Sequence, residues 1–213
     1  MNGAQAADTG WRGSREAWLE AAYAAFVEGG VEAVKILPMA QQLKLSRTSF
    51  YWFFKDREAL LSALADLWAA RTTAGLIAGT RAYAETETEA MLNLIGCFLD
   101  EDVFDSRLEF GMRSWALQAP EIMARINAAD AERLAALRAM LEGWGHAPAD
   151  ADVRARTVYL VQIGYISMQV RETLEVRMAR IPSYVEIYTG KRPEPREIAR
   201  FHARHGFVAA EPA

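Results

Sequence analysis

The strongest constraint on the fold is the near absence of strand-like alternation between polar and apolar residues along the chain. Apolar residues recur instead at helical spacings, and the helix formers Ala, Leu, Glu, Arg and Met are frequent throughout. The prolines agree with this pattern, because Pro38, Pro120 and Pro148 each precede a helical pattern and none lies between Pro38 and Pro120. The sequence therefore predicts an all-α fold.

Length and composition exclude several classes of protein. A chain of 213 residues forms one domain of ordinary size or two small ones, and its 52% hydrophobic content excludes a disordered chain. The longest uncharged stretch, Thr157–Val170, is too short and too polar to span a membrane, and the first ten residues show no secretory signal. Cys97 is the single cysteine, which excludes an internal disulfide and a cysteine-based zinc site. We therefore expect a cytoplasmic protein without a membrane partner.

Caps and stop signals predict the helices of the first third. We expect a helix from Arg15 to Glu28, capped by Ser14 and ended by Gly29-Gly30. Two short helices should follow, Pro38–Leu43 and Arg47–Phe53, joined by a turn at residues 44–46 with Ser46 as the cap of the second. Asp56 should cap a longer helix with Leu60, Leu61, Leu64, Leu67 and Trp68 on one side.

Longer helices are predicted beyond Gly79. Their expected ranges are 86–99, 108–118, 120–142, 148–177 and 195–205. The acidic run at 85–89 is interpreted as a solvated helix start, where negative charge is favourable.

Basic charge is concentrated in one window of this acidic chain. The net charge is −4, yet residues 35–57 contain Lys35, Lys44, Arg47, Lys55 and Arg57 against Asp56 alone. Two short helices with a three-residue turn, followed by a longer helix, are typical of a helix-turn-helix. Phe50 and Phe54 should then face inward, whereas Arg47, Thr48, Tyr51 and Trp52 face outward, as a helix entering the DNA major groove requires. A solvated face of a small helical domain is the plainer alternative for basic charge alone, but the turn length, caps and aromatic run together favour DNA.

These residues also resemble a known family. The segment from Ala21 to Leu60 is similar to the DNA-binding domain of the tetracycline-repressor (TetR) family, most specifically in the run Phe50-Tyr51-Trp52-Phe53-Phe54-Lys55-Asp56-Arg57. The chain departs from the family pattern at three positions. Members of the family often have Thr at the position of Lys35, Gly at that of Lys44 and His at that of Phe53. Phe53 cannot donate the hydrogen bond that His would.

The resemblance implies an N-terminal three-helix helix-turn-helix domain, expected at 12–72, and a C-terminal helical domain for effector binding and dimerisation at 73–213. It implies that Tyr51 contacts a phosphate or a base and that Arg57 lies at a phosphate. The candidate DNA-binding residues are Lys35, Lys44, Ser46, Arg47, Thr48, Ser49, Tyr51, Trp52, Lys55 and Arg57. The candidate effector-pocket residues are Phe98, Met112, Trp115, Tyr165 and Met168, each of which could equally be ordinary core.

The sequence thus predicts a transcriptional regulator, most simply a repressor, that binds a palindromic double-stranded DNA operator as a homodimer and releases it when a small-molecule effector binds. The alternative is a DNA-binding protein whose C-terminal half serves only dimer or partner assembly. Because two recognition helices need two-fold symmetry, the predicted 148–177 helix and the last helix are expected to form the dimer interface.

No catalytic or cofactor site is predicted. His202 and His205 could share a metal ion, but an exposed helix end is the better interpretation, so neither a metal nor a cofactor is expected. Arg113 could meet an anionic effector, yet Glu109 four residues earlier favours an internal ion pair. Cys97 is expected to be buried and inert. An enzyme is therefore the least favoured class.

Overall fold

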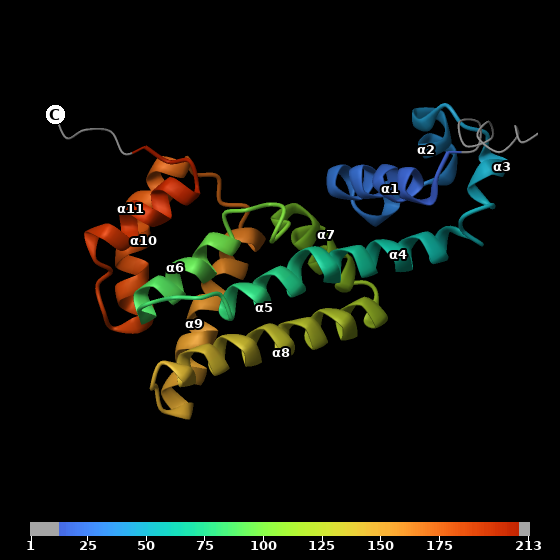
Figure 1. The fold of residues 1–213 in the computed structure, drawn as a ribbon. Coiled ribbons are helices and arrows are strands. Elements are labelled where there is room, and N and C mark those ends of the chain that lie inside the picture. Colours follow the sequence, from blue (N-terminus) through green and yellow to red (C-terminus); the bar gives the residue numbers. More distant parts are fainter. Residues whose placement is uncertain (1–12, 209–213) are drawn as a thin grey trace, which may run out of the picture. The chain divides into compact units, whose positions relative to one another are not determined.

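A computed structural model describes residues 13–208 of the chain, and this described part is helical without any strand (Figure 1). The all-α prediction is therefore confirmed. The first residue of the predicted DNA-binding domain, residue 12, and the last residues of the second domain, 209–213, lie outside the described residues. Of the described helices, none is long and apolar enough to cross a membrane.

The chain forms two compact units, and each unit is built from two separate stretches of the sequence. Unit 1 contains residues 13–69 and 107–126, and unit 2 contains residues 70–106 and 127–208. The helices of unit 1 are α1 (Arg15–Gly29), a 3₁₀ turn η1 (Val31–Ala33), α2 (Ile36–Leu43), α3 (Arg47–Phe50), α4 (Arg57–Ala69) and α7 (Ser106–Ala116). Those of unit 2 are a π-helical turn η2 (Ala70–Ala74), α5 (Gly75–Thr80), α6 (Glu87–Cys97), α9 (Pro148–Ser167), α10 (Leu174–Thr189) and α11 (Pro195–Arg204). Helix α8 (Pro120–Gly143) belongs to both.

The predicted caps fix the helix starts in unit 1. The Ser14 hydroxyl accepts from the backbone N–H of Ala17 at 3.1 Å, and the Asp56 carboxylate accepts from that of Ala59 at 2.8 Å. Gly30 ends α1 with φ 72°, which is accessible to glycine without steric cost. The prediction that α3 extends to Phe53 was wrong, because 51–53 form 3₁₀-type turns after the last α-helical residue, Phe50.

Aromatic side chains dominate the core of unit 1. Trp18 and Phe26 of α1 are fully buried with Phe50, and the Trp18 and Phe50 rings meet edge to face at 5.3 Å. Helix α7 closes this core, because Trp115 packs on Phe26 at 6.0 Å, and a Cβ added at Gly111 would lie 2.5 Å from the Phe26 ring.

A buried carboxylate joins α7 to α4. The Trp68 indole N–H donates to Glu109 at 2.6 Å, and Arg113 donates to the other Glu109 oxygen at 2.8 Å. The side chain of Glu109 has no exposed area, so this charge is stable only because both oxygens are paired. The predicted Glu109–Arg113 pair is confirmed.

In unit 2, a second buried charge holds the π-helical turn. Arg133 of α8 is fully buried and donates to the hydroxyls of Thr72, Thr73 and Tyr159 at 2.7, 3.0 and 2.8 Å. Tyr159 in turn donates to Asp130 at 2.6 Å. Every arm of the guanidinium therefore has an acceptor, which a buried arginine requires.

The start of α6 was predicted correctly, but its solvation was not. Thr86 caps the helix by accepting from the Glu89 backbone N–H at 3.1 Å. Glu87 is nevertheless buried against His146 and Lys191, and Glu89 pairs with Arg200 of α11 at 2.8 Å. Two carboxylates of the acidic run, Glu87 and Glu89, therefore bind the α8–α9 loop and α11 to the start of α6.

The single helix predicted over 148–177 was also wrong. Helix α9 ends at Ser167, Gln169 adopts φ 50°, and α10 begins at Leu174 with Thr173 as its cap. The Thr173 hydroxyl accepts from Val176 N–H at 3.3 Å, which satisfies one of the free donors of the new helix. Helices α10 and α11 pack on α6, and α10 also contacts α9 (Figure 1).

Candidate nucleic-acid interface

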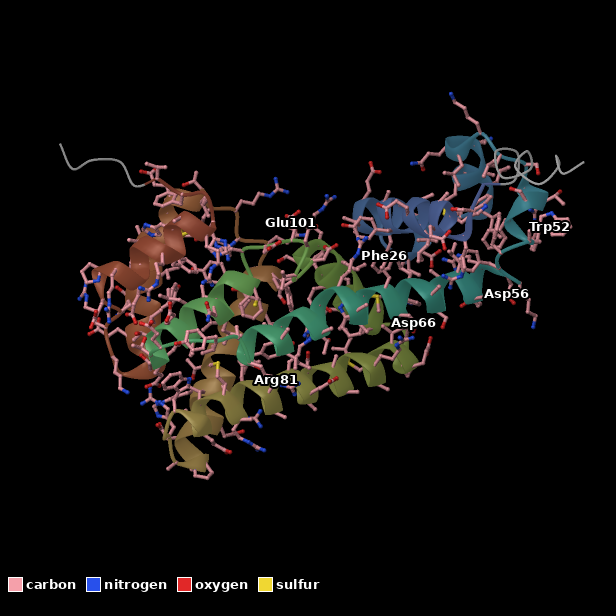
Figure 2. The ribbon with its side chains drawn as sticks, in the orientation of Figure 1. Phe26, Trp52, Asp56, Asp66, Arg81 and Glu101 are labelled. Carbon is pink, nitrogen blue, oxygen red and sulfur yellow. The ribbon has the colours of Figure 1, made fainter. Side chains whose placement is uncertain are left out.

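Helix α3 has one buried and one exposed side, as predicted. Phe50 has no exposed area and stacks on Phe54 at 5.6 Å, whereas Tyr51 and Trp52 are 48% and 65% exposed. Figure 2 shows Trp52 at the outer edge of the unit. The aromatic run is thus divided between core and surface.

The exposed side carries donors and aromatic groups close together. Arg47 and Tyr51 lie one helical turn apart, and the Arg47 guanidinium is 3.5 Å from the Tyr51 hydroxyl oxygen. The exposed candidate residues are Lys35, Lys44, Ser46, Arg47, Thr48, Tyr51, Trp52 and Lys55, and we call them the recognition surface. Four of these are Lys or Arg, so the surface is positive on a chain of net charge −4.

The turn before α3 is made without glycine. Lys44 adopts the left-handed conformation, with φ 56° and ψ 37°, and its N–H donates to the Gln41 carbonyl at 3.1 Å. A left-handed lysine costs more free energy than a left-handed glycine. In return, its exposed side chain adds a positive charge to the recognition surface.

Two candidate residues are engaged inside unit 1. Ser49 is buried, and its hydroxyl donates to the Ser46 carbonyl at 2.8 Å, while Ser46 caps α3 by accepting from the Ser49 N–H at 3.3 Å. Arg57 donates through Nε to the Val34 carbonyl at 2.7 Å and through a terminal nitrogen to the Val31 carbonyl at 2.6 Å. These bonds tie the start of α4 to the segment between α1 and α2.

The five predicted effector-pocket residues are divided between the two units. Phe98 and Tyr165 line a cavity of unit 2, whereas Met168 is 78% exposed and does not line it. Met112 and Trp115 lie on α7 in unit 1, where Met112 is buried. Sequence reasoning missed the cavity residues Arg177, Tyr184 and Tyr188, and their spacing on one face of α10 would have been visible had that helix been predicted.

Within residues 13–208, no three His, Cys, Asp or Glu side chains are grouped to hold a metal ion. Cys97 is buried, and burial raises the pKa of its thiol to about 11, which agrees with the prediction of an inert residue. His202 and His205 are partly buried rather than exposed, and burial lowers the pKa of each.

Comparison with known proteins agrees with this geometry. Residues 19–64 match the family model of bacterial regulatory proteins of the tetR family. The fold is similar to Salmonella enterica GusR, with a TM-score of 0.61, 17% identity and coverage of 83% of this chain and 93% of that one. It is similar to Mycobacterium smegmatis AmtR, with a TM-score of 0.59, 18% identity and coverage of 93% and 97%.

A transcriptional regulator from Rhodococcus sp. has a TM-score of 0.55 at 17% identity, with coverage of 90% of this chain and 97% of that one. No curated protein gives a significant match.

Proposed function

We propose that this chain, whose residues 19–64 match the model of the tetR family of bacterial regulatory proteins, is a repressor of that family that leaves a palindromic operator when a small molecule binds unit 2. The observation that carries the DNA-binding part is the division of α3, in which Phe50 anchors the helix while Tyr51 and its exposed neighbours remain outside. A rigid short helix with donors on its outer side is what major-groove recognition requires. Its place of action is the cytoplasm, where bacterial DNA lies.

We assign separate roles to the residues of the recognition surface. Arg47, Thr48 and Tyr51 present hydrogen-bonding groups to base edges and nearby phosphates, and Lys35, Lys44 and Lys55 neutralise phosphates. Trp52 offers an apolar face to a thymine methyl group or a sugar. Ser46 has a hydroxyl that already accepts the Ser49 N–H as the cap of α3, so it contributes one remaining donor.

Ser49 and Arg57 have different roles in this proposal. The buried hydroxyl of Ser49 is used within α3. Arg57 acts as a positioning residue, because its bonds to Val31 and Val34 fix the N-terminus of α4 against the α1–α2 connection. The free N–H groups at the start of α4 can still receive a phosphate.

The proposed homodimer is supported by an apolar surface on α9. Val153 and Leu160 are 62% and 58% exposed, and they line one shallow groove together with Arg156, Thr157 and Val161. Exposed apolar side chains at this spacing favour a self-complementary helical contact between two copies. Helix α11 offers less apolar surface to this proposed contact than expected, because its exposed side carries Arg196, Arg200 and Arg204.

The cavity beside α10 favours an effector over pure assembly as the role of unit 2, since an assembly module needs no internal space. A direct ligand-binding experiment, described below, separates the two.

DNA recognition is tested by selecting binding sites from a random duplex pool with the full-length protein. We expect an enriched pseudo-palindrome whose half-site centres are about one helical turn, or a multiple of it, apart. Tyr51→Ala should lose the enrichment, and Arg81→Ala, an exposed change in unit 2, should keep it. Failure of the unchanged protein to enrich any sequence would contradict the proposal, and an enriched single half-site would contradict the dimer.

A further inference from the structure

Unit 2 contains a cavity between the end of α6, the C-terminal half of α9 and one face of α10. Its enclosed part measures about 50 Å³, and the cavity is partly open to solvent. Sites that enclose a whole small organic ligand measure roughly 300–1,000 Å³, so a ligand here lies partly in the open part of the cavity. Its apolar wall includes Ile95, Phe98, Leu99, Val158 and Ile181.

The polar groups of the cavity gather around Tyr165. The hydroxyl oxygens of Tyr165 and Tyr184 are 2.9 Å apart, Arg180 lies 3.4 Å from the Tyr165 hydroxyl, and the Arg177 guanidinium lies 5.9 Å from the centre of the Tyr165 ring. One end of the cavity is therefore polar, whereas Val158, two helical turns back along α9, belongs to the apolar part.

The charge at the polar end is not balanced. Arg180 pairs with Glu172 at 2.5 Å. Arg177 also lines the cavity, and within residues 13–208 no carboxylate lies within 4.0 Å of its guanidinium. Two guanidinium groups thus face one carboxylate, and the second arginine is available to pair with an anion.

The tyrosines add hydrogen-bond donors that the protein does not use. In the Tyr165–Tyr184 pair one hydroxyl donates to the other, so one O–H is left for a further acceptor whichever way the pair is arranged. Tyr188 is only 5% exposed and lines the cavity, and in the described part of the chain its hydroxyl has no hydrogen-bond partner. Burial raises the pKa of Tyr188 well above its ordinary value, so this hydroxyl remains a neutral donor at physiological pH.

The unused groups are therefore donors and one cation, arranged beside an apolar wall. We propose that this cavity binds a small carboxylic acid with an apolar body, whose carboxylate pairs with Arg177 and accepts from the remaining O–H of the Tyr165–Tyr184 pair. Its body lies against Phe98, Leu99 and Val158. That this acid acts as the effector rests on the function proposed above, whereas its binding does not.

A cationic ligand is the competing possibility. One oxygen of Glu172, Oε2, is buried without a hydrogen-bond partner among the described residues, and an amine could satisfy it. Glu172 is already neutralised by Arg180 and does not line the cavity. The carboxylate is therefore favoured, and an amine probe decides between them.

The test compares three head groups on two apolar scaffolds by calorimetric titration into the full-length protein without DNA. The probes are 4-phenylbutyrate and 2-naphthoate, their neutral amides, and the corresponding primary amines. We expect a carboxylate to bind at least about 10-fold more tightly than its amide and its amine, as a charge-assisted pair implies. Equal affinities, a preference for an amine, or no binding by either carboxylate would overturn the proposal.

Variants locate the binding site. Arg177→Gln should weaken carboxylate binding about 10- to 100-fold and leave the weak binding of the amide unchanged, and Arg177→Lys should recover part of the loss. Arg171→Gln, which removes an exposed arginine outside the cavity, is the matched control. Tyr188→Phe is a second control inside the cavity, because it removes a hydroxyl about 16 Å along α10 from Arg177 and should leave carboxylate affinity unchanged. Unchanged carboxylate affinity in the Arg177→Gln variant would overturn the assignment.

A second titration separates this inference from the proposed function. Selected operator DNA is followed by fluorescence anisotropy while the tighter carboxylate is added. Release of DNA supports both proposals. Carboxylate binding that depends on Arg177 but leaves DNA affinity unchanged supports the site and contradicts the effector role, because a ligand with equal affinity for both states shifts nothing.

Discussion

Adjacent residues of α3 should respond in opposite ways to the same substitution. Phe50→Ala removes a ring that has no exposed area and contacts Trp18, Tyr51 and Phe54 at centroid distances of 5.3, 5.3 and 5.6 Å. Tyr51→Ala removes a ring that is 48% exposed. The two changes therefore separate the stability of unit 1 from its contact with DNA.

The expected magnitudes follow from burial. Replacing a fully buried Phe by Ala costs about 3–5 kcal/mol, and three aromatic neighbours favour the upper half of that range. Such a loss is a large part of the roughly 5–15 kcal/mol that stabilises an ordinary domain. Tyr51→Ala should change the free energy of unfolding by less than about 1 kcal/mol and weaken specific DNA binding by about 1–3 kcal/mol.

The assay is urea unfolding followed by circular dichroism, with operator binding measured by fluorescence anisotropy on the same preparations. With a slope of about 2 kcal/mol/M, the Phe50→Ala midpoint should fall by roughly 2 M while that of Tyr51→Ala hardly moves. Tyr51→Phe is the matched control for the hydroxyl, since it keeps the ring. If Tyr51→Ala is the more destabilising change, or if DNA binding survives it intact, the division of α3 into core and recognition sides is wrong.

Three further predictions concern other parts of the chain. Because burial raises the pKa of Cys97 to about 11, iodoacetamide at pH 8 should alkylate it slowly in the native protein and rapidly in urea; equal rates would refute its burial. Burial lowers the pKa of His202 and His205 below the ordinary 6.5, so the unfolded chain binds more protons than the folded one below that pH. The free energy of unfolding should therefore fall as the pH drops from 7.5 to 5.5. Urea unfolding of a double His→Asn variant measures this, and the same pH dependence in that variant would contradict it. Lys44→Gly should stabilise the protein by about 1 kcal/mol, since φ is 56° there, yet reduce the salt dependence of DNA binding by about one phosphate contact; an unchanged slope of log affinity against log salt would exclude that contact.

Local chemistry made much of unit 1 predictable from the sequence. Ser14, Ser46 and Asp56 each accept the backbone N–H three residues later, and this capping geometry depends only on neighbouring residues. The Glu109–Arg113 pair was predictable for the same reason, as its members lie one helical turn apart. The Trp68 bond to Glu109 spans 41 residues, and no local pattern indicates it.

The missed break between α9 and α10 shows where local reasoning fails. Helix-forming residues continue through 168–173, and the decisive features are a left-handed Gln169 and a cap at Thr173, which many sequences contain without a break. Pro182 inside α10 also contradicts the ordinary preference against proline in a helix interior. The cavity is lined in part by Arg177 and Tyr188 of α10, so its polar lining could not be predicted without that helix.

The return of α7 into unit 1 limits how the chain can be recombined. Residues 19–64 match the family model. However, Phe26 packs on Trp115 and Trp68 donates to Glu109, and both of these partners lie more than forty residues beyond that stretch. A chimaera that joins only the first seventy residues to the remainder of another protein would leave the Trp68 N–H facing a foreign helix. A side chain larger than glycine at the position of Gly111 would then collide with Phe26. Grafts that carry residues 107–126 with them should stay folded. In evolutionary terms, α7 should therefore change together with α1 and α4 of unit 1, although it follows α5 and α6 of unit 2 along the chain.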